Sequence, residues 1–135
     1  MDISVDFPGG ARVDARFGSF IVRTDQPKAE GGEDAAPTPF ELFLGSLATC
    51  AGYYVIGFCK ARNISIEGIR LIQMDERSPT TKMVERILIE IQLPQGFPKE
   101  YESAVIRAAE KCLVKKHLEH PPSFAITVAT NRASS

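Results

Sequence analysis

The chain has 135 residues and carries 16 Lys and Arg against 17 Asp and Glu, which gives a formal net charge of -1. This balance argues against a role in binding nucleic acid or an anionic membrane surface, because both favour an excess of positive charge. With 44% hydrophobic residues, a chain of this length can bury a substantial core. We therefore expect one domain that spans residues 1–135.

The sequence lacks the patterns of membrane and secreted proteins. No apolar run approaches the roughly 20 residues of a membrane span, and residues 1–5 lack the basic and then apolar order of a signal peptide. We expect a cytoplasmic protein with no membrane partner. The 3 cysteines are an odd number, and no CxxC or paired Cys and His spacing predicts a metal site. The thiols should therefore rest reduced.

Short β-like runs open the chain at residues 3–7, 11–15 and 19–23. Glycines separate the three runs, as tight turns require, so the runs predict a small antiparallel meander. Residues 24–39 are instead rich in Asp, Glu, Gly, Ala and Pro and show no periodicity. This composition predicts a loop that is long enough to be functional.

A long apolar helix is predicted over residues 40–63, with Thr38 or Pro39 at its start and Glu41 near the positive end of its dipole. It is apolar on nearly every face, which predicts a buried helix about 35 Å long at the centre of the fold. Glycines inside it cost helix propensity, so each is expected to allow another backbone to approach closely. These are Gly45, Gly52 and Gly57.

A long hairpin, a second helix and a last strand follow. The hairpin strands are predicted at 65–74 and 84–93, and the second strand places one apolar face toward a helix. That face comprises Ile87, Ile89, Ile91 and Leu93. The second helix is predicted from Pro98 to about Glu119, and residues 124–128 have the pattern of a strand that completes the sheet. These elements give an α+β chain.

Two cysteines on separate amphipathic helices suggest thiol chemistry, although one buried free cysteine is usually an inert hydrophobe. Cys50 lies about two to three turns inside the first helix, too far from its start for the helix dipole alone to stabilise a thiolate. Cys112 lies on the second helix. A reactive Cys50 therefore needs a neighbour from elsewhere. The candidates are Arg12, Arg16, Arg23 and His117.

Other residues of these helices are assigned to packing. Cys59 lies about 180° around the helix from Cys50, so we expect it in the core and not in a redox set. Cys112 and His117 are about 140° apart on one helix, which argues against a direct pair. Tyr53 and Tyr54 could line an apolar substrate pocket, although tyrosines in a buried helix more often pack.

The order of these elements resembles the OsmC/Ohr family, named for osmotically inducible protein C and organic hydroperoxide resistance. The motif P-x-P-x-E-L-x-L-x-x-L-x-x-C at residues 37–50 carries the resemblance, and the second cysteine in the segment Ala108–Cys112 strengthens it. The resemblance implies an OsmC-like fold in which antiparallel sheets wrap long central helices in an intertwined homodimer. Two active sites would lie at the dimer interface.

The same resemblance implies a cofactor-free and metal-free organic hydroperoxide reductase. Cys50 would be the peroxidatic thiolate, and Cys112 would resolve its sulfenic acid as a disulfide that a dithiol reductant restores. An apolar substrate pocket would favour alkyl or fatty-acid peroxides over hydrogen peroxide. Its residues would be Phe40, Phe43, Leu47, Tyr53 and Tyr54.

The chain departs from the Ohr branch at one catalytic position. Phe40 stands where that branch has its catalytic glutamate, and Glu41 follows about 100° further around the helix. Glu41 is therefore a candidate catalytic residue whose reach to Cys50 stays open. Arg12 is the first candidate for the arginine that would pair with the thiolate. The departure makes the chain closer to the OsmC-like members and predicts weak peroxidase activity or another electrophile as substrate.

Two other functions remain open at this point. One is a dimer that binds an apolar small molecule or lipid at its interface, with Cys50 and Cys112 as packing residues. The other is a thiol-dependent hydrolase or transferase in which His117 serves as the base for Cys50, which requires the two groups to lie about 3 Å apart.

Overall fold

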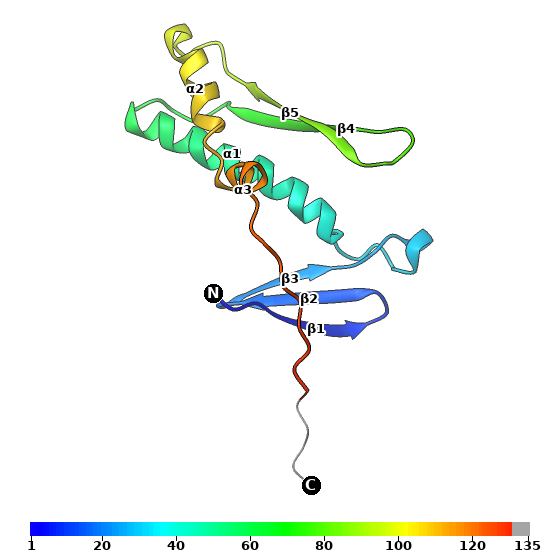
Figure 1. The fold of residues 1–135 in the computed structure, drawn as a ribbon. Helices are drawn as coiled ribbons and strands as arrows, with labels where there is room; N and C mark the ends of the chain where they lie inside the picture. Colours follow the sequence, from blue (N-terminus) through cyan, green and yellow to red (C-terminus); the bar gives the residue numbers. More distant parts are fainter. Residues whose placement is uncertain (131–135) are drawn as a thin grey trace.

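The computed structural model describes residues 1–130 of the chain. A long helix, α1 (Pro39–Ala61), lies at its centre (Figure 1). Thr38 caps this helix: its hydroxyl accepts from the Glu41 N–H at 3.2 Å, and the Glu41 carboxylate accepts from the Thr38 N–H at 3.0 Å. Pro39 occupies the first turn, where a missing N–H costs nothing. The predicted start of the helix is confirmed.

The first 24 residues form the predicted antiparallel meander. Its strands are β1 (Ser4–Gly9), β2 (Arg12–Phe17) and β3 (Phe20–Thr24), paired in that order. The predicted loop follows and contains one short 3-10 turn, η1 (Lys28–Glu30). The buried carboxylate of Asp25 organises this loop by accepting the backbone N–H groups of Gln26, Glu33 and Ala35 at 2.8, 3.2 and 3.0 Å.

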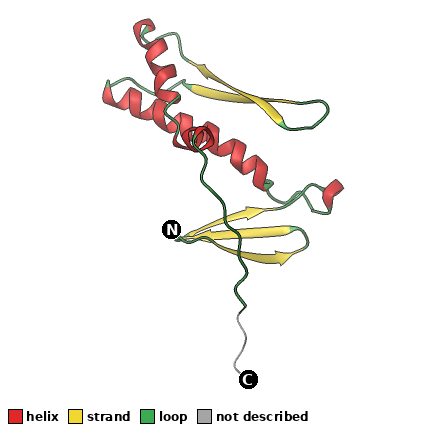
Figure 2. Ribbon diagram, viewed as in Figure 1, coloured by secondary structure: helices red, strands yellow, loops and turns green. Residues whose placement is uncertain are grey.

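The hairpin consists of β4 (Arg70–Arg77) and β5 (Val84–Gln92), two antiparallel strands on the opposite side of α1 from the meander (Figure 2). Its first strand begins later than predicted, because a turn closed by the Ile69 N–H donating to the Ile66 carbonyl at 3.0 Å precedes it. Gln73 of β4 ties the hairpin to the helix by donating its side-chain amide to the Leu44 carbonyl at 2.9 Å. The α+β class with antiparallel strands is confirmed.

The second helix is broken, so the prediction of one helix from Pro98 to Glu119 is wrong. A short turn, η2 (Lys99–Tyr101), leads into α2 (Glu102–Ala109), and a separate helix, α3 (Leu113–Glu119), follows. In one unbroken helix, Lys115 and Lys116 would lie on the same buried face as Cys112, three and four residues earlier. The break between α2 and α3 changes which residues face the core, so that Val114 is half-buried and both lysines stay exposed.

The core lies where the C-terminal half of α1 meets α2 and one end of the hairpin. Its buried members are Val55, Phe58, Cys59, Phe97, Val105 and Ala108. From the predicted inward face of β5, Ile91 packs against this cluster, as does Leu93 just beyond the strand. The meander contributes no residue to the cluster. A large part of the apolar surface of the meander is therefore open in the single chain, including Phe7 and Phe20.

One face of α1 is exposed, which corrects the prediction of a helix buried on nearly every face. Tyr53 is 69% exposed and Ile56 is 42% exposed. A Cβ atom placed on Gly45, Gly52 or Gly57 would have no described atom within 4 Å, apart from the helix's own backbone and the adjacent residues. The predicted close approach of another backbone at these glycines is therefore not seen within the described chain.

By length and composition α1 could cross a membrane, contrary to the expectation that no segment is apolar enough. Only 28% of its most apolar stretch is buried within the chain. Helices at the centre of globular proteins have the same composition, so this property alone does not place the chain in a membrane.

The predicted last strand at residues 124–128 is absent; these residues have no regular secondary structure. Phe124, Ile126 and Val128 are almost fully exposed. The segment has the alternation of a strand, but a strand needs a neighbour to accept and donate its backbone hydrogen bonds. Within residues 1–130 no such neighbour pairs with it.

Candidate thiol site

Two cysteines from different helices meet beside α1. Cys50 lies in the middle of α1 and is partly exposed, whereas Cys112 is buried and immediately precedes α3. Both are free thiols. The two thiols lie close enough for each to shift the pKa of the other, so the structure brings together the two cysteines that were predicted to pair.

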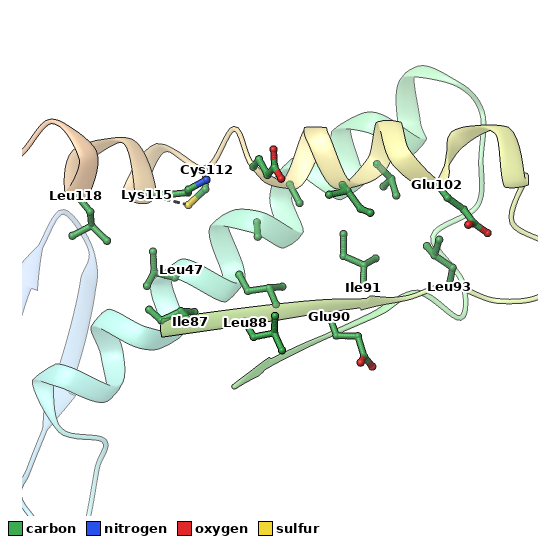
Figure 3. A pocket seen from close by; sticks show the side chains of 16 residues that line it. Leu47, Ile87, Leu88, Glu90, Ile91, Leu93, Glu102, Cys112, Lys115 and Leu118 are labelled. Atoms are coloured by element: carbon green, nitrogen blue, oxygen red, sulfur yellow. Dashed lines mark hydrogen bonds between the residues drawn. The ribbon is translucent and has the colours of Figure 1, made fainter. Parts of the chain in front are cut away.

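Cys112 is the N-cap of α3. Its sulfur accepts the backbone N–H of Lys115 at 3.4 Å, which is the capping contact that Ser, Thr, Asn or Asp usually makes (Figure 3). The N–H groups of Leu113 and Val114, in the same turn, lie near enough to Cys50 to lower the pKa of its thiol. The first turn of α3 therefore lies beside both sulfurs.

The pKa of Cys50 is lowered by its surroundings. Burial alone raises it, but the Val114 N–H, the Cys112 thiol and the Leu113 N–H outweigh burial because each stabilises the thiolate. The groups that lower this pKa are mainly backbone N–H groups and not the side-chain cations that were predicted. A lower pKa increases the fraction of Cys50 that is thiolate, which is the reactive form.

The pKa of Cys112 is raised, first by burial and then by its hydrogen bond to Cys50 and the repulsion from the Cys50 thiolate. The Lys115 and Val114 N–H groups oppose these effects without cancelling them. The surroundings therefore shift Cys50 toward the thiolate and Cys112 toward the protonated thiol.

An apolar groove of about 720 Å³ runs from Cys112 between β5 and the helices α2 and α3. Figure 3 shows Cys112, Lys115 and Leu118 at one end of this groove, with Leu47 and Ile87 facing them, and Glu102 with Leu93 at the other end. A cavity of this size is in the range that holds a small organic ligand.

Comparison with known proteins decides the family. The family model described as OsmC-like protein matches residues 31–127, a span that includes α1, the hairpin and both cysteines of the site. The chain belongs to the OsmC-like family. No match was found among curated proteins.

Solved structures agree with the OsmC-like fold. An osmotic stress induced and detoxification response protein from Psychrobacter arcticus has a TM-score of 0.72 at 22% identity, over 84% of this chain and 85% of its own. An organic hydroperoxide resistance protein OsmC from Legionella pneumophila gives 0.55 at 21%, over 87% and 89%. The organic hydroperoxide resistance protein OhrB of Bacillus subtilis gives 0.51 at 20%, over 87% and 90%.

In this OsmC-like chain the carboxylate of Glu41 is occupied by the capping box of α1, where the Thr38 N–H lowers its pKa most. It lies about two and a half turns before Cys50. Phe40 stacks on Phe43 with 5.6 Å between ring centroids, and the Arg77 guanidinium lies 5.6 Å from the Phe40 ring. The position at which the Ohr branch has glutamate thus contributes to an aromatic cluster.

Of the five residues predicted to form the substrate pocket, only Leu47 lines the groove beside Cys112. Tyr53 instead lines a smaller hollow of about 360 Å³ on another side of α1, and its ring meets that of Tyr54 edge to face. The contribution of β5 to this groove was not predicted, because no local sequence pattern shows which helix the inward face of the strand covers.

None of the predicted cationic activators lowers the pKa of Cys50. Arg16 pairs with Asp6 at 2.9 Å, and Arg12 acts on Asp25, whose pKa is lowered chiefly by the Ala35 N–H. Arg23 lies exposed on β3. The imidazole Nδ1 of His117 lies 2.8 Å from the Leu113 carbonyl. The sequence indicates the N–H groups near Cys50 in only one way: the helical spacing of apolar residues in the predicted second helix ends after Cys112.

The third cysteine, Cys59, is fully buried in the core cluster, as predicted. Burial raises its pKa, with a smaller opposing effect of Arg62. Full burial and a raised pKa are typical of an inert packing cysteine, whereas Cys50 is partly exposed and has a lowered pKa. Within residues 1–130 no group of three His, Cys, Asp or Glu side chains could hold a metal ion.

Proposed function

We propose that this OsmC-like protein is a cofactor-free thiol peroxidase that reduces organic hydroperoxides with Cys50 and Cys112. The observation that carries the proposal is the proximity of two free thiols, in which the partly exposed Cys50 has a lowered pKa and the buried Cys112 a raised one. Membership of the OsmC-like family supports a role in redox chemistry or peroxide stress. The structural likeness to proteins named for organic hydroperoxide resistance supports the same role.

The proposed chemistry has two oxidative steps. The Cys50 thiolate attacks the terminal oxygen of the hydroperoxide; the O–O bond breaks, an alcohol leaves after taking a proton, and Cys50 becomes a sulfenic acid. The Cys112 sulfur then attacks the Cys50 sulfur, which forms a disulfide and releases water made from the sulfenic hydroxyl and the Cys112 proton. A dithiol reductant returns both residues to thiols.

The two pKa shifts suit these roles. A peroxidatic cysteine must be thiolate before the peroxide arrives, whereas a resolving cysteine that stayed thiolate would compete for it. The apolar groove that starts at Cys112 supports a substrate with a hydrocarbon group, since burying such a group contributes roughly 25 cal/mol per Å². Hydrogen peroxide would gain nothing from this surface.

We propose that the protein acts as a homodimer in the cytoplasm, where reductants keep its thiols reduced. The exposed face of α1 and the unpaired apolar segment 124–128 support this assembly. So do the exposed aromatic rings of the meander, Phe7 and Phe20. Apolar surfaces of this extent usually mark an interface in a globular protein.

Turnover of cumene hydroperoxide with a small dithiol as reductant tests the proposal. Cys50→Ser should abolish turnover, because no thiolate is left to attack the peroxide. Cys112→Ser should permit one oxidation of Cys50 and then stall or over-oxidise it. Cys59→Ala serves as the matched control and should turn over like the wild type. Equal turnover in the Cys50 and Cys112 variants would contradict the proposed two-cysteine mechanism.

The groove also favours a second candidate function, the binding of an apolar small molecule or lipid without chemistry. Its volume of about 720 Å³ and its aliphatic lining are typical of such sites. A protein that only binds would retain an apolar fluorescent probe equally well when Cys50 is replaced by serine and would consume no peroxide. The hydrolase alternative is not supported, because His117 does not contribute to the state of Cys50.

A further inference from the structure

The groove that starts at Cys112 is apolar along its length and carries charged side chains at its ends. Figure 3 shows Lys115 at the Cys112 end, and Glu102 beside Leu93 at the opposite end. The walls between these ends are aliphatic side chains of β5 and α2. They include Ile87, Ile89, Ile91, Val105 and Ile106.

The positive charge of the groove is partly offset, whereas its negative charge is not. Lys115 is the only basic residue among the described residues that line it, and its ammonium lies 3.8 Å from the carboxylate of Glu119. Glu102 and Glu110 also line the groove, and within residues 1–130 neither forms an ion pair. The carboxylate of Glu90 points away from the helices in Figure 3. The groove is therefore acidic, and its far end is marked by Glu102.

We propose that Glu102 is a specificity-determining residue, which makes the groove select hydroperoxides whose far end carries no negative charge. This selectivity rests on the proposed function and narrows its substrate class to uncharged long-chain hydroperoxides, such as those of esterified fatty chains. With the reacting group beside the cysteines, a chain extended along the groove brings its other end to Glu102. A carboxylate at that end would meet a like charge and would leave water beside an apolar wall, and both effects disfavour it.

The basic residues around α2 do not reverse this charge. The groove-facing residues of α2 recur at spacings of three and four, as one face of a helix requires, and they begin with Glu102. Arg107 lies outside this face, and Lys99 precedes the helix; neither lines the groove. Glu100 is an exposed carboxylate two residues before Glu102 that does not line the groove either. It therefore provides a matched control for a change of charge outside the groove.

The test needs a substrate long enough to reach Glu102. Since α2 has 8 residues, it is about 12 Å long, which an extended chain of about twelve carbons can follow. The probes are ω-hydroperoxydodecanoate, its methyl ester and its choline ester, which differ only in the charge of the far end. Each is compared by kcat/KM with a small dithiol as reductant. Cumene hydroperoxide is the short uncharged control.

The wild type should prefer the methyl ester to the carboxylate by about fivefold, which is the effect of one like charge about 4 Å away in water. The cationic choline ester should be the best of the three. Glu102→Gln should remove most of this preference, and Glu102→Lys should favour the carboxylate. Glu100→Gln should keep the ratio of the wild type. All four proteins should consume cumene hydroperoxide alike.

Two readouts separate charge selection from a structural role. Glu102 lies in the first turn of α2, where an acidic residue also favours the helix dipole. If stability were its only role, Glu102→Gln would change turnover of the ester and the acid by the same factor, and the proposed selectivity would be overturned. If charge decides, the preference of the wild type should shrink in about 1 M salt, where the Debye length falls to about 3 Å.

Displacement of an apolar fluorescent probe measures the same selectivity without chemistry. Methyl dodecanoate should displace the probe from the wild type at a lower concentration than dodecanoate, and Glu102→Gln should reduce the difference. If the wild type consumes no hydroperoxide and displacement still depends on Glu102, the proposed peroxidase function fails and the selectivity stands. If the hydroperoxides are consumed in the same ratio by the wild type, Glu102→Gln and Glu102→Lys, the peroxidase function stands and the role of Glu102 is overturned.

Discussion

The backbone N–H of Val114 lowers the pKa of Cys50, although the two residues lie on different helices. Among the groups that lower this pKa it has the largest effect, and the chain breaks between α2 and α3 just before it. In an unbroken helix the N–H of Val114 would bond to a carbonyl four residues earlier and would be lost to Cys50.

Replacing Leu113 by proline should raise the pKa of Cys50, because it removes one N–H donor to the thiolate. Leu113 is the first residue of α3, where proline is tolerated, and Cys112 before it has ψ 121°, a conformation that a following proline accepts. Alkylation of Cys50 against pH is the measurement. Leu113→Ala keeps the N–H and is the control; a shift of equal size in the alanine variant would contradict the explanation.

Oxidation should loosen α3. A Cys50–Cys112 disulfide replaces the thiolate and the capping thiol by sulfurs that accept hydrogen bonds weakly, so the N–H groups of Leu113, Val114 and Lys115 lose their partners. Hydrogen exchange of these amides should accelerate after diamide treatment and slow again after reduction. Cys112→Ser cannot form the bridge and should not respond. Unchanged exchange in the bridged wild-type protein would show that the disulfide leaves the first turn intact.

Replacing Cys59 by serine should destabilise the fold without affecting the redox chemistry. Cys59 is 0% exposed in an apolar cluster, so a hydroxyl there loses its hydration at a cost of about 1–3 kcal/mol in the free energy of unfolding. Urea denaturation measures this cost, and peroxide turnover at 25 °C should match the wild type. A loss of turnover in a folded Cys59→Ser protein would assign Cys59 a role that its place in the core does not predict.

The exposed face of α1 should form the dimer interface. Tyr53 is 69% exposed, and Tyr53→Lys would place a charge in the interface without a partner, which weakens association strongly. Light scattering after gel filtration should give about twice the chain mass of 14.8 kDa for the wild type and a lower mass for the variant. Lys60→Glu changes a residue that is already charged on the same helix and should remain dimeric. A monomeric wild type would contradict the proposed assembly.

Acid should weaken the loop between β3 and α1 through Asp25. Its folded-state pKa is lowered, first by the Ala35 N–H, from an ordinary value of 3.8. The unfolded chain therefore binds its proton first as pH falls, so the contribution of Asp25 is complete above about pH 4 and is lost below it. Thermal melts of the wild type and Asp25→Asn should converge in this acid range. A constant difference in Tm between pH 6 and pH 2.5 would contradict this assignment.

Local signals in the sequence predicted local structure well. Thr38, Pro39 and Glu41 predicted where α1 begins because capping involves only neighbours in the chain. Glycines placed the turns of the meander for the same reason. The pairing of Cys50 with Cys112 followed from the family resemblance, and the structure brings the two thiols into contact.

The features that failed depend on contacts between distant segments. The break before α3 has no glycine or proline, since the side chain of Cys112 itself supplies the cap. Residues 124–128 have the pattern of a strand but lack a partner within the chain. Tyr53 was expected near Cys50 because it follows one turn later, but it faces another side of α1. The helical pattern of a sequence shows how side chains are spaced around a helix. It does not show which other element each side chain packs against.

The most direct test of the central claim is the intact mass of the reduced protein after one equivalent of cumene hydroperoxide, followed by peptide mapping without reduction. The account predicts a loss of about two mass units that maps to a Cys50–Cys112 bridge, with Cys59 still a free thiol. An unchanged mass, or oxidation that maps to Cys59 while Cys50 remains reduced, would contradict it.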